Sequence, residues 1–288
     1  MDRTFAIIVN YRKPALTEEA VASLGNRSGE NAVSIIVVDN GSADGSLERL
    51  KESCAGCTVL DAGGNLGFSG GNNVGIRYAL DHGAKYVLLL NNDAVAERGA
   101  AEALLAAADQ KTIVVPQIVC ASDPSRVWYG GGHVSWMRGG FYHDAGATSA
   151  ASARDVDFAT GCCMLLPVAF FRECGLMDER FFLYCEDAEL CLRAVRAGYR
   201  IRYEPCAVVR HKVSASTGGE RSPMSAYYGT RNRLMLLSQY RFPLVAFAYV
   251  VATRLVKLLS SPFYPAERYV LLGIIDWLAG RTGRKEGL

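Results

Sequence analysis

The sequence predicts an α/β fold in which a mainly parallel β-sheet is flanked by helices, with a helical extension at the C-terminal end. Three observations predict it. Residues 4–115 alternate short apolar runs with single helix patterns, which is the order of right-handed β–α–β units. The apolar runs are short and continuous, as in strands buried on both faces. From Pro223 onward only helical patterns follow.

The first half of the chain gives five strands and four helices in strict alternation. Pro14 suits the first turn of the first helix, because proline lacks the N–H that such a position leaves unpaired. The expected strands cover residues 4–10, 33–39, 58–61, 85–90 and 112–115, and the expected helices cover residues 14–24, 46–54, 70–82 and 97–108.

The pattern changes after the fifth strand. Residues 117–160 are rich in Gly, Ser, Ala and aromatic residues, so we expect hairpins and loops there, with a lid as their suggested role. A strand is expected at 161–166, a helix at 186–197 that ends at Gly198, and a short strand at 200–203.

Composition excludes some partners and indicates a compartment. The chain has 288 residues, 50% hydrophobic and 21% charged, with a net charge of +2, so nothing indicates a nucleic-acid partner. It has nine cysteines, and we expect no cleavable signal peptide, because Met1-Asp2-Arg3 leads straight into an expected strand. We therefore expect a cytoplasmic protein with free thiols. The C-x-x-C at Cys54 and Cys57 lacks a partner pair and is interpreted as a chance spacing.

The apolar run 86–90 stops abruptly at Asn91-Asn92-Asp93. Ligands of open α/β sheets bind beyond the carboxyl ends of such strands, so an acid placed there is a candidate ligand group. Asn and Asp are also good N-caps, and a helix from residue 94 to 108 would use them in that way. These three residues alone do not decide between the two interpretations.

Two further clusters follow neighbouring strands. Asp39-Asn40-Gly41-Ser42 ends the second strand, where a carboxylate either accepts hydrogen bonds from a base or ribose or closes a turn. The segment 63–73 is a run of Gly and Asn that opens a helix, and such backbone admits an anion at the helix N-terminus. It matches neither a Walker loop nor a clean G-x-G-x-x-G.

Two more clusters lie in the second half. Glu186, Asp187 and Glu189 begin a helix directly after aromatic residues, which either complement the helix dipole or hold one carboxylate in a dry site suited to general-base work. His211 follows a strand, and beside Asp93 it would complete a site for a divalent metal.

Taken in order, these motifs resemble those of family 2 glycosyltransferases, and most closely the bacterial rhamnosyltransferase-like branch. The resemblance covers roughly residues 4–240. Its motifs are Asp39-Asn40-Gly41-Ser42, Asn65-x-Gly67-Phe68-x-x-Gly71-Asn72-Asn73, Asn91-Asn92-Asp93, Thr160-Gly161-Cys162-Cys163-Met164-Leu165, Glu186-Asp187-x-Glu189-Leu190-x-x-Arg193 and His211.

The resemblance implies a GT-A fold and inverting transfer of a sugar from a nucleotide-sugar. By it, Asp187 would be the general base with Glu186 beside it, and Asp93 and His211 would hold Mg²⁺ or Mn²⁺. The nucleotide-sugar would contact Asn10, Asp39, Asn65, Gly67, Phe68, Asn72, Asn92 and Arg231. The pocket for acceptor and donor sugar would include Gly161, Cys162, Tyr184 and Trp128.

The resemblance also implies a domain division and a substrate class. Residues 1–222 would form the catalytic domain, with a nucleotide-binding half (1–115) and an acceptor half (116–222), and residues 223–288 the helical extension. The donor would be a dTDP- or UDP-sugar, most plausibly of rhamnose, and the acceptor a lipid-linked or polysaccharide glycan of the cell surface. One position departs from the family's Asp-x-Asp motif, because its first residue here is Asn91.

Two other functions fit parts of the pattern. A sugar-phosphate nucleotidyltransferase uses a similar sheet, but the turn after the first strand, Asn10-Tyr11-Arg12-Lys13-Pro14, lacks the glycines expected there. A non-catalytic nucleotide-sugar-binding protein would fit a site weakened by Asn91.

The C-terminal extension is apolar and interspersed with cations, which suits a helix lying in the surface of an anionic membrane better than one spanning it. We expect it to hold the enzyme at the cytoplasmic face of the cell membrane, and the alternative is packing on the core or on a second subunit, as in a homodimer. The cations are Arg254, Lys257, Arg268, Arg281, Arg284 and Lys285, and the aromatic residues are Phe263, Tyr264, Tyr269 and Trp277.

Overall fold

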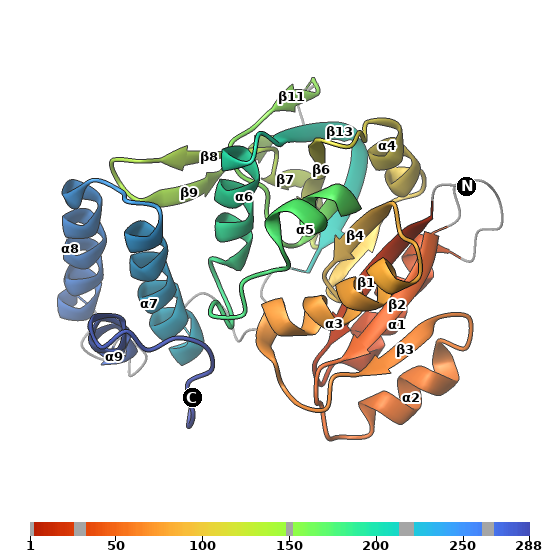
Figure 1. Cartoon of the computed structure of the whole chain (residues 1–288), viewed down its shortest axis with the longest axis horizontal. Helices are drawn as coiled ribbons and strands as arrows, with labels where there is room; N and C mark the ends of the chain where they lie inside the picture. The colour runs from red at the N-terminus through yellow and green to blue at the C-terminus, as the bar shows by residue number, and fades with distance from the viewer. Residues whose placement is uncertain (1–2, 26–32, 148–151, 213–221, 261–267) are drawn as a thin grey trace.

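One large mixed sheet organises the chain, and three helices stand beside it as a separate group (Figure 1). The structure is a computed structural model that describes residues 3–25, 33–147, 152–212, 222–260 and 268–288. Within them the sheet has 11 strands, eight of which follow the order β10-β7-β6-β12-β4-β1-β2-β3.

Four parallel strands form the first half of this sheet, in the order β4-β1-β2-β3. The register aligns Asn10 with Asp39 and Asp39 with Asp61, so polar residues end neighbouring strands at one edge. The four strands confirm the expected ones to within a residue, and they are β1 (Thr4–Asn10), β2 (Val33–Asp39), β3 (Thr58–Asp61) and β4 (Tyr86–Leu90).

Helices α1 (Pro14–Leu24) and α2 (Ser46–Ser53) pack on one face of these strands and α3 (Gly67–Asp81) packs on the other. Alternation along β1 separates the two faces. Asn10 accepts a hydrogen bond from Thr17 of α1 at 2.9 Å. A Cβ on Gly75 of α3 would lie 2.6 Å from Ile7. Glycine at that position therefore lets α3 approach the sheet closely.

The sheet becomes mixed at β12 (Cys163–Pro167), which runs antiparallel between β4 and β6 (Thr112–Cys120). A short helix, α5 (Val168–Cys174), follows it directly and was not predicted, because seven residues carry too little periodicity. The expected strand at 161–166 is confirmed with a shift of one to two residues.

Two elements of the second half differ from the sequence prediction in length. β13 runs from Arg200 to His211, well beyond the expected 200–203, because it pairs with β6 past an irregularity between Glu204 and Val208. β6 is likewise longer than the expected 112–115. The helix expected at 186–197 is confirmed as α6 (Glu186–Arg196).

The segment after Asp93 corrects one of the two interpretations of the strand end. Ala94–Ala96 is strand β5, paired with β13, and helix α4 begins only at Ala100 and ends at Ala106. No helix therefore starts at residue 94, and the N-cap interpretation of Asn91-Asn92-Asp93 is wrong.

Residues 117–160 form strands and a hairpin, as expected. The lid remains a prediction, and residues 148–151 of this segment lie outside the described ones. The strands are β7 (Asp123–Tyr129), β8 (Gly132–Ser135), β9 (Gly140–His143), β10 (Gly146–Ala147) and β11 (Arg154–Asp155), and β8 and β9 form a separate antiparallel pair.

The C-terminal extension is helical as predicted. Helices α7 (Pro223–Gln239), α8 (Leu244–Ser260) and α9 (Arg268–Leu278) lie together at the left of Figure 1. Ser222 caps α7 by accepting a hydrogen bond from the Ser225 N–H at 3.2 Å. Gly273 of α9 sits against the Tyr227 carbonyl of α7, where a Cβ would lie at 2.8 Å. Glycine thus permits close packing of α7 and α9.

A buried carboxylate also joins these helices. Asp276 of α9 is fully buried and accepts hydrogen bonds from Tyr227 at 2.6 Å, Arg281 at 2.8 Å and Lys285 at 2.8 Å. Burial acts to raise the pKa of Asp276, but the bonds from Lys285, Tyr227 and Arg281 outweigh it and lower that pKa to about 2.

Asp276→Asn is expected to reduce the free energy of unfolding at pH 7 by about 1–2 kcal/mol. The folded-state pKa lies below that of an unfolded aspartate, so this stabilisation is present above about pH 4 and is lost as the pH falls through 2. Urea unfolding of wild type and Asp276→Asn should show a difference in the free energy of unfolding that becomes smaller from pH 4 to pH 2. An equal difference at pH 7 and pH 2.5 would mean that the charge of Asp276 contributes nothing to the free energy of unfolding.

All nine cysteines are free thiols, as expected. Burial, together with the neighbouring Cys54, raises the pKa of Cys57 to about 11. Redox-active C-x-x-C motifs instead lower a thiol pKa. The raised pKa of Cys57 agrees with the interpretation of the C-x-x-C as a chance spacing.

Candidate active site

The ends of β1 and β2 form a closed hydrogen-bond set around Asp39. Its carboxylate is buried and accepts bonds from Asn10 at 2.7 Å, from the Ser42 hydroxyl at 2.6 Å and from the Ser42 N–H at 3.0 Å. Asp39 therefore shapes the turn, as one interpretation of the motif predicts. Its contact with a base or ribose stays a prediction.

The Asn/Gly loop wraps onto this turn. Asn40 accepts from the Leu66 N–H at 3.0 Å and donates to the Gly67 carbonyl at 3.0 Å. Asn65 accepts from the Gly67 N–H, also at 3.0 Å. Gly67 has φ +74° and starts α3 three residues earlier than predicted.

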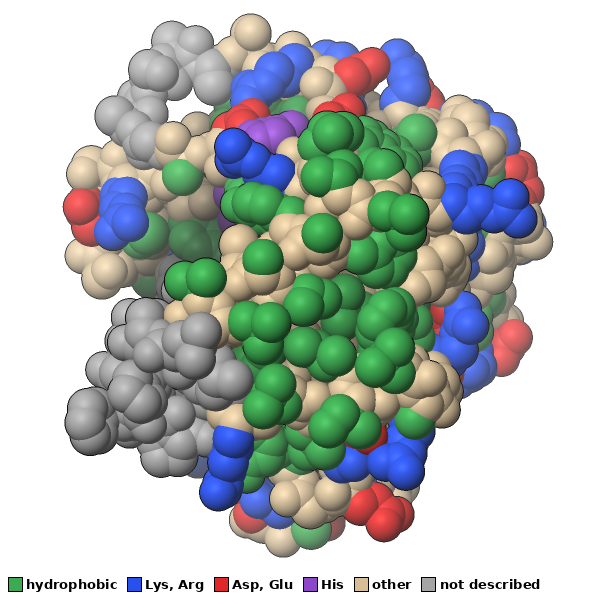
Figure 2. All heavy atoms as spheres, turned by 90° about the vertical axis from the view of Figure 1, so that its left-hand side faces the viewer, with side chains coloured by type: hydrophobic (Ala, Val, Ile, Leu, Met, Phe, Trp, Pro, Cys, Tyr) green, Lys and Arg blue, Asp and Glu red, His purple; other side chains and the backbone are tan. Residues whose placement is uncertain are grey.

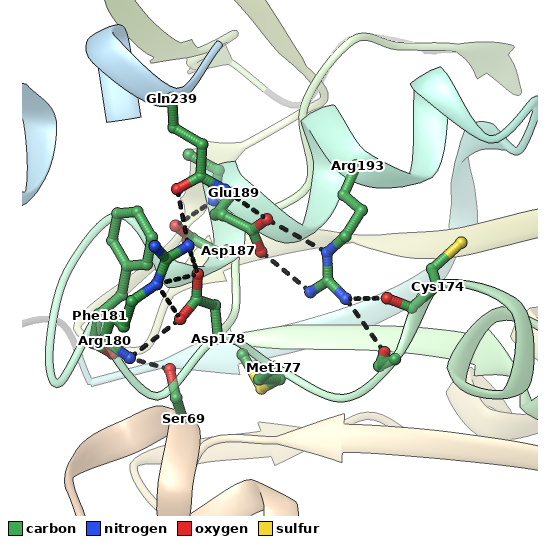
Figure 3. A network of polar contacts seen from close by, with 12 residues as sticks. Ser69, Cys174, Met177, Asp178, Arg180, Phe181, Asp187, Glu189, Arg193 and Gln239 are labelled. Carbon is green, nitrogen blue, oxygen red and sulfur yellow. Dashed lines mark hydrogen bonds and ion pairs between the residues drawn. The ribbon is translucent and has the colours of Figure 1, made fainter. Parts of the chain in front are cut away.

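The first turns of α3 dock on the loop that precedes α6 (Figure 3). Ser69 donates to the Phe181 carbonyl at 2.8 Å, and the Phe68 N–H donates to the Phe182 carbonyl at 2.8 Å. Asn73 accepts from the Met177 N–H at 3.0 Å. Asn72 is buried and donates to the Phe68 carbonyl within α3. The loop predicted to bind the nucleotide thus also positions the segment that leads to Glu186.

Gly67→Ala is expected to reduce the free energy of unfolding far more than Gly63→Ala, although both glycines have nearly the same φ angle. A Cβ on Gly67 would lie 2.2 Å from the Phe182 carbonyl, whereas one on Gly63 (φ +73°) meets nothing within 4 Å. The left-handed conformation alone costs about 1–2 kcal/mol with a side chain, and the clash adds roughly 1–3 kcal/mol. Urea unfolding measures both losses, and equal losses would contradict the contact with Phe182.

The end of β4 brings Asp93 against His211. Asp93 Oδ1 lies 3.2 Å from His211 Nε2, and both side chains are buried. The Lys212 N–H donates to the Asp93 carbonyl at 2.9 Å, which fixes the end of β13 to this strand end. The Asn92 amide donates to the Thr17 hydroxyl of α1 at 3.4 Å, and its contact with a nucleotide-sugar stays a prediction.

The Trp128 ring packs against His211. Trp128 meets the imidazole edge-on, with 4.7 Å between ring centroids, and also contacts His143 at 4.6 Å. Burial lowers the pKa of His143 to about 4, with the nearby His211 adding to the effect, so His143 is uncharged at neutral pH. Sequence reasoning missed His143, since only the fold of β7 and β9 brings it here.

The other acidic pair lies at the start of α6. Tyr184 and Cys185 have φ +67° and +70°, and Glu186 and Asp187 follow in the first helical turn. Asp187 accepts from the Gly161 N–H at 3.0 Å and from its neighbour's N–H, that of Ala188, at 2.8 Å. Glu186 is buried and Asp187 is half-buried.

Of the three carboxylates predicted here, Glu189 serves the structure. It is 2% exposed and pairs with Arg193 at 2.9 Å and with the Tyr240 hydroxyl at 2.8 Å. Figure 3 shows Glu189 between Arg193 and Gln239. Glu189 therefore joins α6 to α7, which leaves Glu186 and Asp187 for chemistry.

Burial raises the pKa of both Glu186 and Asp187, and the adjacent Asp187 charge raises that of Glu186 further. Two backbone N–H groups favour the charged form of Asp187. Glu186 Oε2, by contrast, has no hydrogen-bond partner among the described residues. Asp187 is thus the member of the pair that ionises first.

Two consecutive residues just before β12, Gly161 and Cys162, contact the segments that carry the two acidic sites. The Gly161 N–H bonds to Asp187, and the Cys162 carbonyl accepts from the Asn91 N–H at 2.8 Å. Neighbouring Cα atoms are about 3.8 Å apart, so the strand end that carries Asp93 and the helix start that carries Asp187 flank one short segment. A Cβ on Gly161 would also lie 3.2 Å from Phe68.

Arg231, which the resemblance assigns to the nucleotide-sugar, is buried within α7. It is 1% exposed in α7, donates to Asn232 at 2.9 Å and to Tyr227 at 3.2 Å, and lies over the rings of Tyr227 and Tyr228. Its Nη2 has no hydrogen-bond partner in the described part of the chain. Its contact with a nucleotide-sugar stays a prediction.

Asp93 and His211 are the described groups best suited to a divalent ion. Nowhere in the described ranges do three or more His, Cys, Asp or Glu side chains form a metal-binding group. Mg²⁺ and Mn²⁺ are commonly held by one or two protein ligands plus the phosphates of a substrate. His211 Nδ1 lacks a hydrogen-bond partner in the same residues. The pair therefore fits an ion that a diphosphate would complete.

Comparison with known proteins agrees with the site. The family described as "Glycosyl transferase family 2" matches residues 5–175. The low-salt glycan biosynthesis hexosyltransferase Agl10 of Haloferax volcanii is 30% identical over 247 residues, which span 82% of this chain and 75% of that protein. The N-acetylglucosaminyl-diphospho-decaprenol L-rhamnosyltransferase of Mycobacterium tuberculosis is 30% identical over 243 residues, 76% of this chain and 78% of that one.

Solved structures show the same fold. The crystal structure of GalNAc-T7 with UDP, GalNAc and Mn²⁺ superposes with a TM-score of 0.61 at 14% identity, over 92% of this chain and 58% of that one. The expected α/β architecture is thereby confirmed as GT-A. The chain belongs to glycosyltransferase family 2 and is a glycosyltransferase.

Proposed function

We propose that this protein is an inverting glycosyltransferase that moves a sugar, rhamnose being the first candidate, from a dTDP- or UDP-sugar to a lipid-linked or polysaccharide acceptor. The observation that carries the proposal is the placing of Asp187 and of the Asp93–His211 pair on either side of residues 161 and 162. The similarity to a mycobacterial rhamnosyltransferase supports the sugar and the lipid-linked acceptor.

Asp187 would act as the general base. The acceptor hydroxyl must lose its proton as its oxygen attacks the anomeric carbon and the bond to the diphosphate breaks on the opposite face. A half-buried carboxylate with a raised pKa is a stronger base than an exposed one, and the two backbone N–H groups that bond to Asp187 fix its direction. One displacement inverts the anomeric centre, and the proton ends on Asp187.

Asp93 and His211 would hold Mg²⁺ or Mn²⁺. A bound divalent ion neutralises charge that develops on the leaving diphosphate. Asp93 supplies an anionic oxygen and His211 an imidazole nitrogen, and the contact with Lys212 keeps the two side chains facing each other. Next to His211 lies the uncharged ring of Trp128, which also contacts the uncharged ring of His143.

A panel of dTDP-, UDP- and GDP-sugars tests this function by thermal shift and by hydrolysis of the donor. A donor at 100 times its Kd adds about 2.7 kcal/mol, which for a chain of this size raises Tm by roughly 5–10 °C. Release of dTDP or UDP from the stabilising donor is the expected result. Release of pyrophosphate would indicate a nucleotidyltransferase, and binding without turnover would indicate a binding protein.

We also infer that α8 and α9 hold the enzyme on an anionic membrane surface. Figure 2 shows apolar side chains gathered over this face, bordered by Lys and Arg. Within the described ranges no helix has the length and apolarity needed to cross a bilayer. The exposed apolar residues of the two helices are Leu244, Val245, Tyr249, Leu255, Val256, Leu271, Ile275 and Leu278.

Cations border this face in the structure. Arg138 lies 5.8 Å from the ring centroid of Tyr249, Arg241 lies three residues before the start of α8, and Arg268 begins α9. Such a combination of apolar and cationic groups favours anionic lipid headgroups. Of the residues named from the sequence, Phe263 and Tyr264 lie outside the described ones, as does the side chain of Lys257.

Sedimentation with vesicles tests the surface. Wild-type protein should sediment with vesicles containing phosphatidylglycerol and much less with phosphatidylcholine alone. Leu244→Asp with Val256→Asp should abolish sedimentation, while Val195→Asp, on an exposed apolar residue of α6, should not. A dimer in solution that the paired substitutions convert to a monomer would instead assign the face to a second copy of the chain.

A further inference from the structure

The turn that carries the acidic pair adopts a backbone conformation that it would not keep alone. Tyr184 and Cys185 are consecutive non-glycine residues with φ near +70°. Such conformations persist only where surrounding contacts hold them, and they gather at functional sites. Because Cys185 directly precedes α6, this turn sets the direction of Glu186 and Asp187.

The side chain of Asn232, in α7, is hydrogen-bonded to this turn. Its amide donates to the Leu183 carbonyl at 2.8 Å and to the Tyr184 carbonyl at 2.9 Å. Its own oxygen accepts from Arg231 at 2.9 Å, and the side chain is fully buried. Both amide protons are therefore committed to carbonyls of the strained turn.

A series of hydrogen bonds connects Asn232 to α9. Arg231 donates to the Tyr227 hydroxyl at 3.2 Å, and that hydroxyl donates to Asp276 at 2.6 Å. Asp276 is fully buried in α9. The contacts run without a break from the C-terminal helix to the carbonyl of Tyr184.

We infer that Asn232 is a positioning residue for Asp187, and that Tyr227 and Asp276 act through it from α7 and α9. The inference rests on the proposed base role of Asp187. The C-terminal helices then have two separable tasks, since their outer face meets the membrane and their inner face completes the active site.

Kinetics of Asn232→Ala and Tyr227→Phe test the inference. Asn232→Ala should lower kcat by about 10- to 100-fold and Tyr227→Phe by about 3- to 10-fold, with the KM for the donor within about twofold of wild type. Trp277→Phe is the matched control, because it removes a hydrogen bond from α9 to Ser238 at 3.1 Å and leaves the chain to Asn232 intact. Unchanged kcat in a folded Asn232→Ala protein would overturn the inference.

Hydrogen exchange supplies a readout that needs no activity. The N–H groups of Gly161 and Ala188 both bond to the Asp187 carboxylate. In Asn232→Ala and Tyr227→Phe these amides should exchange faster, while amides of β1 should not change. If wild-type protein turns over no donor, the proposed function fails, yet faster exchange would still support the positioning. Unchanged exchange in both variants would refute the positioning whatever the reaction.

Discussion

Asp187→Asn is expected to lower kcat by about 10²- to 10⁴-fold, the range that a positioned general base contributes. The amide keeps the size of the carboxylate, and its oxygen can still accept from Gly161, while the bond from the Ala188 N–H to the second oxygen is lost. The donor should bind with unchanged affinity, because neither change alters the predicted nucleotide-binding residues. Single-turnover kinetics and thermal shift with the donor measure the two quantities separately.

The neighbouring acid provides the discriminating comparison. Because the Asp187 charge raises the pKa of Glu186 further, Glu186 stays protonated when Asp187 ionises, and a glutamine imitates that neutral form. Glu186→Gln should cost less than about tenfold in kcat. Asp109→Asn, at an exposed carboxylate paired with Arg200, should cost nothing. If Glu186→Gln is the more severe change, the two roles are exchanged.

The raised pKa of Asp187 also fixes the sign of the pH dependence. The base works only when ionised, so a pKa above the ordinary value of 3.8 makes the rate fall at a higher pH than for an exposed aspartate. Burial sets this upward shift, and the titratable groups nearest to Asp187 are Glu186, Cys185 and Cys191. A rate that persists unchanged down to pH 4 would contradict this role.

The first half of the fold could be predicted because its signals are local. Buried strands such as 33–39 and helix starts such as Pro14 depend on neighbours in the sequence. The early start of α3 could not be predicted, because it depends on Gly67 fitting against Phe182, 115 residues away. Likewise Ala94–Ala96 is a strand only because β13 pairs with it.

The site divides in the same way. Asp39 and Asp93 could be placed together because parallel strands end at one edge of a sheet. Sequence order also placed Asp187 and His211 at this edge through the family resemblance. The hydrogen bond from the Asn232 amide to the Tyr184 carbonyl could not be predicted, because side-chain hydrogen bonds between distant segments leave no periodic pattern in the sequence. The structural use of Glu189 was hidden for the same reason.

Asp93→Asn is expected to lower kcat/KM by about 10²- to 10³-fold, which corresponds to about 3–4 kcal/mol of transition-state stabilisation. The substitution keeps the size of the side chain but removes the anionic oxygen that faces His211 at 3.2 Å. With one charge fewer, the site should need a far higher Mn²⁺ concentration for half-maximal rate. Titrating Mn²⁺ and Mg²⁺ into metal-free enzyme measures that concentration directly.

Asn91→Asp is the matched comparison to Asp93→Asn, because it adds a carboxylate where Asp93→Asn removes one. It restores a carboxylate at the first position of the family's Asp-x-Asp motif, two residues before Asp93, and Asn91 is bonded through its backbone to Cys162. Hard cations prefer carboxylate oxygens to amide oxygens, so Asn91→Asp should lower the Mn²⁺ concentration at half-maximal rate while Asp93→Asn raises it. Opposite shifts from two residues of one strand end would locate the ion there, since a general loss of stability moves both variants in the same direction. If the Mn²⁺ dependence of Asp93→Asn equals that of wild type, Asp93 holds no metal, and its contact with His211 serves only to join β4 to β13.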